Sequence, residues 1–501
     1  MATPHDMTPS QRYLAKLEDA IEEIWGIAKR FGLDPYPVNF ELVPATIMYE
    51  FGAYGLPGRF SHWSRGKAYY RMKTEYDYGL SKIYELVVNT NPSYAFLMEQ
   101  NDLLQNEVVV AHVLGHTDFF KNNVYFRSTP PNMIDKVSVN ADRVRKYEFD
   151  HGVAKVERFL DAVLAIEEHI DPNTYLRQRR GERADEGVYA SKEDSAEHKR
   201  TSAYDDLWAL DQSEATREEE AAEAERRAEA RRKRFPAEPQ KDILKFLAEH
   251  APNLEAWQRD LLLIVREEML YFVPQMRTKI INEGWASLIH SRITREMDLD
   301  DNEFTQFAQM HAGVLATSRM RINPYHLGYH LLEDIERRWE HPTEEEQAQG
   351  RLPGQGKAKL FEVREVESDV SLLRNYLTKD LVEELDLYLY KKVGDEWVIV
   401  EKNWEKVRDG LVTSMTNFGY PYITVWDADY NGNTELLLHH HFDGQELDLP
   451  YAEKTLEHLY QIWSRPVHLE TVRDEKPMRL SYNGERHSHV LLDEEDDDEQ
   501  G

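Results

Sequence analysis

Two histidines separated by four positions, His112 and His116, have the spacing of a helical metal-binding pair. On an α-helix, four residues turn through about 400°, so both imidazoles would stand on the same face, one turn apart. At that separation two imidazoles can bind one metal ion. The other residues from 108 to 114 are apolar, so we expect a buried helix whose imidazoles need partners. Those partners are a metal ion or, alternatively, the carbonyls and carboxylates of a protein core.

A second pair of such side chains, Glu283 and His290, lies far along the chain in another apolar, helical stretch. Seven residues turn through about 700°, so the two side chains lie within about 20° of each other on a helix. By themselves they are equally well explained as a buried hydrogen-bonded couple. Together with His112 and His116 they favour one shared site, with His290 as a fourth ligand or a proton carrier. Such ligands suit Zn²⁺, with Fe²⁺ or Mn²⁺ as alternatives.

Three acidic residues are candidates for the general base of this site: Asp118, Glu267 and Glu268. Val113 follows His112, so the pattern is not H-E-x-x-H and lacks the glutamate base of that peptidase motif. Asp118 lies off the histidine face, but near the expected helix end it could orient an imidazole through the nitrogen not used on the metal. The sequence does not choose among the three carboxylates.

A stretch rich in Gly, Pro and aromatic residues, from 34 to about 70, reads as irregular. It is too aromatic for a solvated linker, so we expect it to pack against the protein or to line a pocket. Its candidate substrate-binding residues are Arg59, His62, Trp63, Arg65 and Lys67. An ordered structural loop explains the same residues equally well.

The composition excludes several classes of function. The 501 residues include 61 basic and 92 acidic side chains, a net charge of −31, which argues against a nucleic acid or an anionic membrane as the main partner. The chain has no cysteine, so any metal ligands must be histidines and carboxylates. No run approaches the ~20 apolar residues of a membrane span, and the first residues do not resemble a signal peptide. We therefore expect a cytoplasmic protein.

The hydrophobic pattern predicts a mostly α-helical N-terminal and central core with a smaller α+β C-terminal domain. Helices are expected over residues 10–31, with Gly32 as the stop, and over residues 80–126, with an interruption near residues 89–92 before Pro92. Further helices are expected over residues 133–169, 254–276, 404–418 and 451–463. Strands are expected over residues 360–370, 385–390, 397–401, 422–427 and 434–442, with a hairpin turn at 431–433.

The domain organisation follows from shifts in composition. Two parts of a helical core are separated by a charged, low-complexity insertion or linker, and an acidic, disordered tail follows the α+β domain. In chain order, we place the core at 1–177, the insertion at 178–240, the second part of the core at 241–355, the α+β domain at 356–480 and the tail at 481–501.

Several unusual motifs give the chain a resemblance to the SpoVR family, the stage V sporulation protein R and its relatives. They are GLP (55–57) with HW (62–63), YELV (84–87), AHVLGHTDFFKNN (111–123), REEMLYF (266–272), NEGWA (282–286) and NPYHLG (323–328). The resemblance covers nearly everything outside the insertion and the tail. It implies a link to spore cortex formation in spore formers, with relatives in bacteria that do not sporulate.

The resemblance also bears on the site. The H-x-x-G-H and N-E-G-W-A patterns of the family are similar to zinc-peptidase ligand sets, in which a glutamate on a later helix completes a histidine pair. This implies His112, His116 and Glu283 as ligands. The absence of a glutamate directly after His112 departs from the peptidase pattern and leaves the base open.

Two hypotheses follow from the sequence. In the first, the protein is a cytoplasmic metal-dependent hydrolase of an amide or ester bond, acting on a small molecule, a peptide or a peptidoglycan-related substrate. In the second, it is a non-catalytic adaptor or regulator of envelope assembly or stress response. The histidine and glutamate side chains are then a structural polar core, and the charged insertion and tail suit a protein partner.

Overall fold

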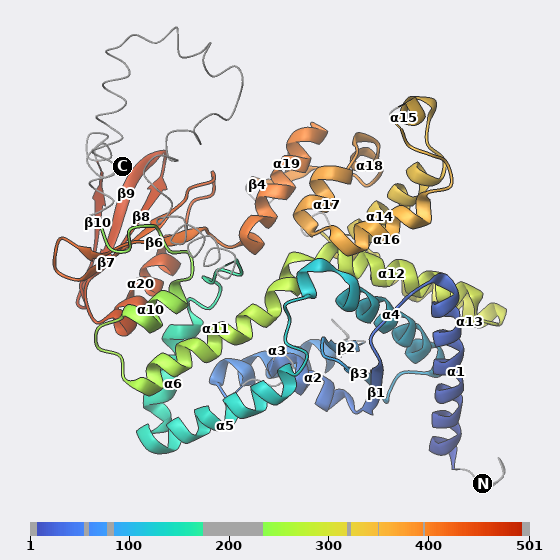
Figure 1. The fold of residues 1–501 in the computed structure, drawn as a ribbon, viewed down its shortest axis with the longest axis horizontal. Coiled ribbons are helices and arrows are strands. Elements are labelled where there is room, and N and C mark those ends of the chain that lie inside the picture. Colours follow the sequence, from blue (N-terminus) through green and yellow to red (C-terminus); the bar gives the residue numbers. More distant parts are fainter. Residues whose placement is uncertain are drawn as a thin grey trace, which may run out of the picture. The chain divides into compact units, whose positions relative to one another are not determined.

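The chain folds into two compact units, each assembled from two separate stretches of sequence (Figure 1). The first comprises Met1–Lys146 and Tyr271–Gly419, and the second comprises Tyr147–Leu270 and Tyr420–Gly501. The computed structural model describes residues 8–54, 60–77, 85–173, 234–317, 322–348, 350–393 and 396–492. The centre of the predicted charged insertion and the end of the acidic tail lie outside these residues.

The first unit is mainly helical. In its N-terminal stretch the elements are α1 (Pro9–Phe31), β1 (Val38–Val43), α2 (Ala45–Tyr54), α3 (Trp63–Asp77), β2 (Glu85–Val88), β3 (Ser93–Met98), α4 (Leu103–Asn122), η1 (Val124–Phe126) and the start of α5 (Met133–His151). Its second stretch contains α12 (Lys279–Glu296), α13 (Asp301–Val314), α14 (Pro324–Glu340), α15 (Glu344–Ala348), α16 (Gly356–Val366), α17 (Asp369–Tyr376), α18 (Lys379–Glu384), β4 (Leu389–Val393), β5 (Glu396–Glu401), α19 (Trp404–Met415) and η4 (Thr416–Gly419).

The core of the first unit forms around α4 and α12, which pack against each other, and α14, which packs against α12. Both α4 and α12 are buried over most of their length and not along one face only. A helix that is enclosed in this way can carry polar side chains only where they find partners inside the protein. In contrast, α1 is amphipathic, begins with a capping box at Thr8 and ends at Gly32, the predicted stop, in the left-handed conformation.

A small three-stranded sheet lies beside these helices in the first unit, with the order β1-β3-β2. β1 and β3 are parallel, and β2 and β3 are antiparallel, with Glu85 paired to Leu97. Glu85 is the first residue of β2, so its side chain is held where the strand begins.

The second unit contains a five-stranded sheet with the order β10-β9-β8-β7-β6. β7 and β8 are parallel and the other neighbours are antiparallel. Its strands are β6 (Ile423–Tyr430), β7 (Glu435–His440), β8 (Val467–Arg473), β9 (Lys476–Tyr482) and β10 (His487–Leu491), and its helices include α6 (Val153–Leu164), α10 (Ile243–His250), most of α11 (Ala256–Arg277) and α20 (Leu449–Trp463).

The predicted fold class is confirmed: a helical core is followed by a sheet-containing C-terminal region. The hairpin predicted around 431–433 joins β6 to β7. Within the described part of the chain, no helix is long and apolar enough to cross a membrane.

Three predicted segments are wrong. Residues 85–88 and 93–98, expected to be helical on either side of the interruption near residues 89–92, form β2 and β3, because these short, apolar runs are paired across the small sheet. Residues 360–370, expected to be a strand, lie mainly in α16, where Leu360 and Val363 are buried at a three-residue helical step. The stretch from 34 to 70, expected to be irregular, contains β1, α2 and the start of α3.

Candidate metal centre

The two histidines of α4 lie on one buried face, as their spacing predicts. Asp102 caps the helix and forms a capping box with Gln105, which fixes the first turn. His112 and His116 follow Gln105 by about two and about three turns. Each is only 4% exposed, and their ring centroids are 4.6 Å apart.

Two glutamates from other elements approach the Nε2 atoms of this pair. His112 Nε2 lies 3.3 Å from Glu85 Oε1 and 3.7 Å from Glu283 Oε2. His116 Nε2 lies 3.4 Å from Glu283 Oε2 and 3.9 Å from Glu85 Oε1. One ligand atom each from Glu85, His112 and His116 lies within 4.8 Å of the other two. Two nitrogens and two carboxylate oxygens, from β2, α4 and α12, therefore converge on one small volume.

The Nδ1 atoms of both histidines are engaged on the other side of each ring. His116 Nδ1 lies 3.0 Å from Oδ1 of Asn282, and His112 Nδ1 lies 2.8 Å from Nδ1 of His290. His290 Nε2 in turn lies 2.9 Å from Nδ1 of His311 on α13. Metal-binding histidines characteristically use one ring nitrogen on the ion and hydrogen-bond the other, which fixes the tautomer and the orientation of the ring.

These contacts place His290 behind His112, at the Nδ1 side of its ring and opposite the Nε2 atom that faces the two glutamates. Both of its ring nitrogens are hydrogen-bonded to other imidazoles, and the residue is 2% exposed. A ring engaged at both nitrogens has no lone pair to offer an ion. The arrangement therefore favours a role for His290 in holding the His112 ring in place over the role of a fourth ligand.

Small residues allow the helices to approach closely enough for this convergence. A Cβ added to Gly115, between the two histidines, would lie 2.7 Å from Cα of Ala286 on α12. A Cβ added to Gly284 would lie 2.5 Å from Cα of Gly328 on α14. Both distances are shorter than a real side chain tolerates, so glycine is required at positions 115 and 284 for these crossings.

The electrostatics of the cluster keep the Glu283 carboxylate charged and the Tyr325 phenol neutral. Burial raises the pKa of Glu283, but the adjacent imidazoles outweigh that effect and hold the pKa well below its usual range. Burial lowers the pKa of His116, but the neighbouring Glu283 carboxylate outweighs it and raises the pKa. Burial and the charges of Glu283 and Glu85 raise the pKa of Tyr325, so its hydroxyl stays protonated and can donate a hydrogen bond.

The donor set fits a divalent cation. His112 Nε2 and Glu283 Oε2 are buried, and neither makes a hydrogen bond to the residues that the structure describes. Unsatisfied buried groups of this kind are costly, and an ion between them would satisfy both. Two imidazoles with carboxylate oxygens suit zinc and, among other ions, iron or manganese.

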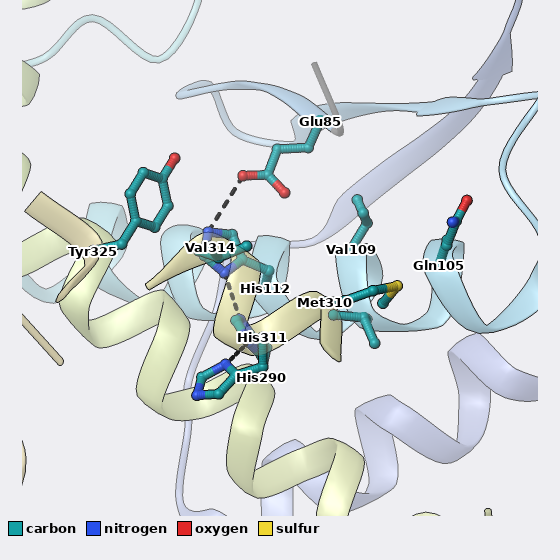
Figure 2. A pocket seen from close by; sticks show the side chains of 10 residues that line it. Glu85, Gln105, Val109, His112, His290, Met310, His311, Val314 and Tyr325 are labelled. Carbon is teal, nitrogen blue, oxygen red and sulfur yellow. Dashed lines mark hydrogen bonds and ion pairs between the residues drawn. The ribbon is translucent and has the colours of Figure 1, made fainter. Parts of the chain in front are cut away.

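A cavity of about 330 Å³ adjoins the cluster. It is lined by Glu85, Gln105, Val108, Val109, His112, His290, Met310, His311, Val314 and Tyr325. In Figure 2, dashed lines connect Glu85, His112, His290 and His311 in series, and Tyr325 lies on the opposite side of His112 from Val109 and Met310. The cluster is therefore accessible from a space large enough for a small ligand group.

Asp118, a candidate base, lies in a separate buried network. Its carboxylate accepts hydrogen bonds from Trp285 Nε1 at 3.1 Å, from Arg364 Nη1 at 2.9 Å and from the Asp34 backbone at 2.8 Å. The Nδ1 atoms of His112 and His116 lie beside His290 and Asn282 instead, so Asp118 does not orient either ring. Asp118 is thus placed as a structural anion that ties α4 to α12 and α16.

The other candidate residues come from α11 and from residues 59–67. Glu267 and Glu268 lie on α11, in the part of this helix that belongs to the second unit. His62 is buried, with Nδ1 2.7 Å from Ser64 Oγ, and Trp63 is 55% exposed at the start of α3. Among the described residues, none that lines the cavity comes from α3, the helix that carries Arg65 and Lys67. Arg59 lies outside the described residues.

Three residues of the site were missed by the reasoning from sequence: Glu85, His311 and Tyr325. A signal existed for two of them, because Glu85 lies in the YELV motif and Tyr325 in the NPYHLG motif. Neither has a partner at helical spacing that would have marked it as a ligand. His311 lies in no such motif.

The fold and the cluster thus define a helical protein with a buried histidine and carboxylate centre. Comparison with known proteins agrees with the motifs: the chain belongs to the SpoVR family. The family model described as "SpoVR like protein" matches residues 11–420, and that of the "SpoVR-like C-terminal domain" matches residues 421–474. The chain is 30% identical over 496 residues to the "Uncharacterized protein YcgB" of Escherichia coli (strain K12), covering 93% of each chain. No solved structure matches.

Proposed function

We propose that this protein is a divalent-metal hydrolase of an amide or ester bond. One observation carries the proposal: the Nε2 atoms of His112 and His116 face two carboxylates, while both Nδ1 atoms are already engaged. This division of the two ring nitrogens is what a metal ligand needs, and a purely structural polar core does not require it.

The cavity distinguishes the two carboxylates. Glu85 lines the cavity, whereas Glu283 is not among its lining residues. The pKa of Glu283 lies well below its usual range, because the adjacent imidazoles outweigh the effect of burial. We therefore assign His112, His116 and Glu283 to the ion and Glu85 to proton transfer at the cavity side. A divalent cation held there would polarise a substrate carbonyl and make water more acidic near neutral pH.

The chain's own residues complete the reaction. Glu85 accepts a proton from the attacking water and delivers it to the leaving nitrogen or oxygen as the acyl bond to that atom breaks. The neutral hydroxyl of Tyr325, next to Glu283, donates a hydrogen bond to the substrate oxygen on which negative charge develops. The products are a carboxylic acid and an amine or alcohol, so the atoms of one water molecule are accounted for.

Zinc is the preferred ion, with iron or manganese as alternatives. The resemblance to a family linked with spore cortex and cell-envelope formation favours a peptide or a peptidoglycan-related molecule as substrate. A cytoplasmic location is part of the same proposal.

Metal analysis of the purified full-length protein tests the site. We expect about one equivalent of a divalent metal per chain, loss of that metal in His112→Ala, and retention of it in His250→Ala. His250 is a partly exposed histidine at the end of α10 and serves as the matched control. Hydrolysis of a panel of simple esters and amides should be abolished by a chelator and restored by zinc.

The alternative, a non-catalytic adaptor with a structural polar core, predicts the opposite. Wild-type protein would contain no stoichiometric metal, and His112→Ala would complement a deletion strain. A specific protein partner would then be captured by the full chain and lost when residues 178–240 and 493–501 are removed.

A further inference from the structure

The cavity beside the cluster has two apolar walls. On α4, Gln105, Val108, Val109 and His112 recur at three- and four-residue steps, so one stripe of the helix lines the cavity from Gln105 to the metal centre. On α13, Met310 and Val314 lie one turn apart and line the same cavity. Aliphatic side chains from two helices therefore border a space that ends at the proposed reaction centre.

Among the described residues that line the cavity, none is a lysine or an arginine. If His112 binds an ion through Nε2, its Nδ1 carries the proton and donates to His290 Nδ1. His290 then carries its proton on Nε2 and donates to His311 Nδ1. In this sequence of hydrogen bonds each ring donates at one nitrogen only. Burial also lowers the pKa of His311 to about 4, in agreement with a neutral ring.

A negative charge is present at the same wall, because the Glu85 carboxylate lines the cavity. An anionic group such as a phosphate or a carboxylate would meet one carboxylate, imidazoles that are hydrogen-bonded to one another, and aliphatic side chains there. Along the two helix walls, away from the ion at the end of the cavity, it would lose its hydration without gaining a partner of opposite charge among the described lining residues, which is unfavourable. A cavity of about 330 Å³ is also at the small end of the range for ligand pockets.

We infer that this cavity is the subsite for a small, uncharged aliphatic group joined to the bond that is cleaved, such as a short acyl chain or an aliphatic amino-acid side chain. The inference deepens the proposed function and rests on it, since the cavity is assigned to substrate because it ends at the proposed metal centre. It narrows the substrates to amides and esters that are apolar next to the scissile carbonyl.

Direct binding tests the subsite independently of catalysis. Ligand-observed NMR would measure the binding of hexanamide, acetamide and hexanoate to the full-length protein after treatment with a chelator. We expect hexanamide to bind about tenfold more tightly than either acetamide or hexanoate, because only hexanamide is both long enough to fill the apolar walls and uncharged. Equal or tighter binding of hexanoate, or no binding of hexanamide, would overturn the inference.

Variants that fill the cavity test whether hexanamide binds there. Val314→Trp and, as a second variant, Met310→Trp should each weaken hexanamide binding about tenfold, with thermal unfolding confirming that the chain is folded. Val139→Trp introduces the same residue at an exposed position of α5 and should leave binding unchanged. If the folded Val314→Trp and Met310→Trp proteins bind as wild type does, the site is elsewhere and the inference fails.

The two proposals fail in different ways. Hexanamide binding that is sensitive to Val314→Trp, in a protein without metal or hydrolase activity, would uphold the subsite and reject the hydrolase. Metal-dependent hydrolysis that is indifferent to acyl chain length and to Val314→Trp would uphold the hydrolase and reject the subsite.

Discussion

Gly284 of α12 lies directly against Gly328 of α14: a Cβ added to Gly284 would be 2.5 Å from Cα of Gly328, and one added to Gly328 would be 2.8 Å from Cα of Gly284. The crossing occurs one residue after Glu283 and three residues after Tyr325. It therefore brings together the carboxylate and the phenol that we place at the metal centre. Since the neighbouring atoms are backbone, they cannot move aside as the end of a flexible side chain could.

Substitution of Gly284 by alanine should separate these helices. We expect Gly284→Ala to lower the free energy of unfolding by about 3 kcal/mol and to reduce metal content, because the added methyl group overpacks the crossing. Gly66→Ala is the matched control, since a Cβ there meets nothing within 4 Å in α3, and it should change stability by less than about 1 kcal/mol. Urea unfolding measures the free energy of unfolding of both variants, and metal analysis measures their metal content. Equal effects of the two substitutions would contradict the close crossing.

The two glutamates should differ in what they control. We expect Glu283→Gln to lose the metal, because the neutral amide is a poor replacement for a carboxylate ligand. Glu85→Gln should keep most of the metal and lose hydrolytic activity about 100-fold or more, as expected for loss of a general base. Metal analysis of both proteins, followed by a rate measurement on Glu85→Gln, makes the distinction. Loss of metal from Glu85→Gln alone would exchange the two roles.

The Asp118–Arg364 pair should act on stability and not on the chemistry. Asp118 is fully buried and Arg364 is nearly so, and the two are joined at 2.9 Å. Removing one partner of such a pair leaves a buried charge, so Asp118→Ala should cost about 3–5 kcal/mol in denaturant unfolding. Asp142→Ala, which breaks the exposed pair with Arg145, should cost less than about 1 kcal/mol.

A milder variant separates the structural role of Asp118 from that of a base. Asp118→Asn keeps the shape of the side chain and should retain metal and activity in the fraction that remains folded. A large loss of turnover with normal stability and metal content would instead support Asp118 as the base.

Glu107, a buried residue of α4 away from the histidine face, should make stability depend on pH. Burial, followed by the charges of Glu303, Glu23 and Asp102, raises the pKa of Glu107 from 4.5 to about 7. Between these values the folded chain binds more protons than the unfolded chain, so the free energy of unfolding falls as the pH rises from about 4.5 to about 7. The resulting destabilisation remains above pH 7.

Glu107→Gln removes this titrating group. We expect the variant to be more stable than wild type at pH 8 by about 1 kcal/mol, after allowance for solvent screening, and to show a flatter profile between pH 4.5 and 7. Glu344→Gln, on the exposed helix α15, should follow the wild-type profile. Urea unfolding across this pH range provides the measurement, and parallel profiles for wild type and Glu107→Gln would rule out the assignment.

Local patterns explain which structural predictions succeeded. The helix with His112 and His116 on one face, the stop at Gly32 and the hairpin between β6 and β7 each depend on residues only a few positions apart. Residues 85–88, 93–98 and 360–370 were assigned to the wrong type of element. Short apolar runs fit either a strand or a buried helix, and pairing with β3 or packing in the helical core decides between them.

The sequence by itself determined the family, the helical core and the buried histidine pair, because motifs and i,i+4 spacing are local properties. Only the tertiary structure brought Glu85 and Glu283 to the same two Nε2 atoms, placed His290 behind His112 and moved Asp118 into a separate ion pair. The physical reason is that these relationships arise where α4, α12 and α14 cross at Gly115, Gly284 and Gly328. Such a crossing is set by the packing of whole helices, which no spacing within one helix encodes.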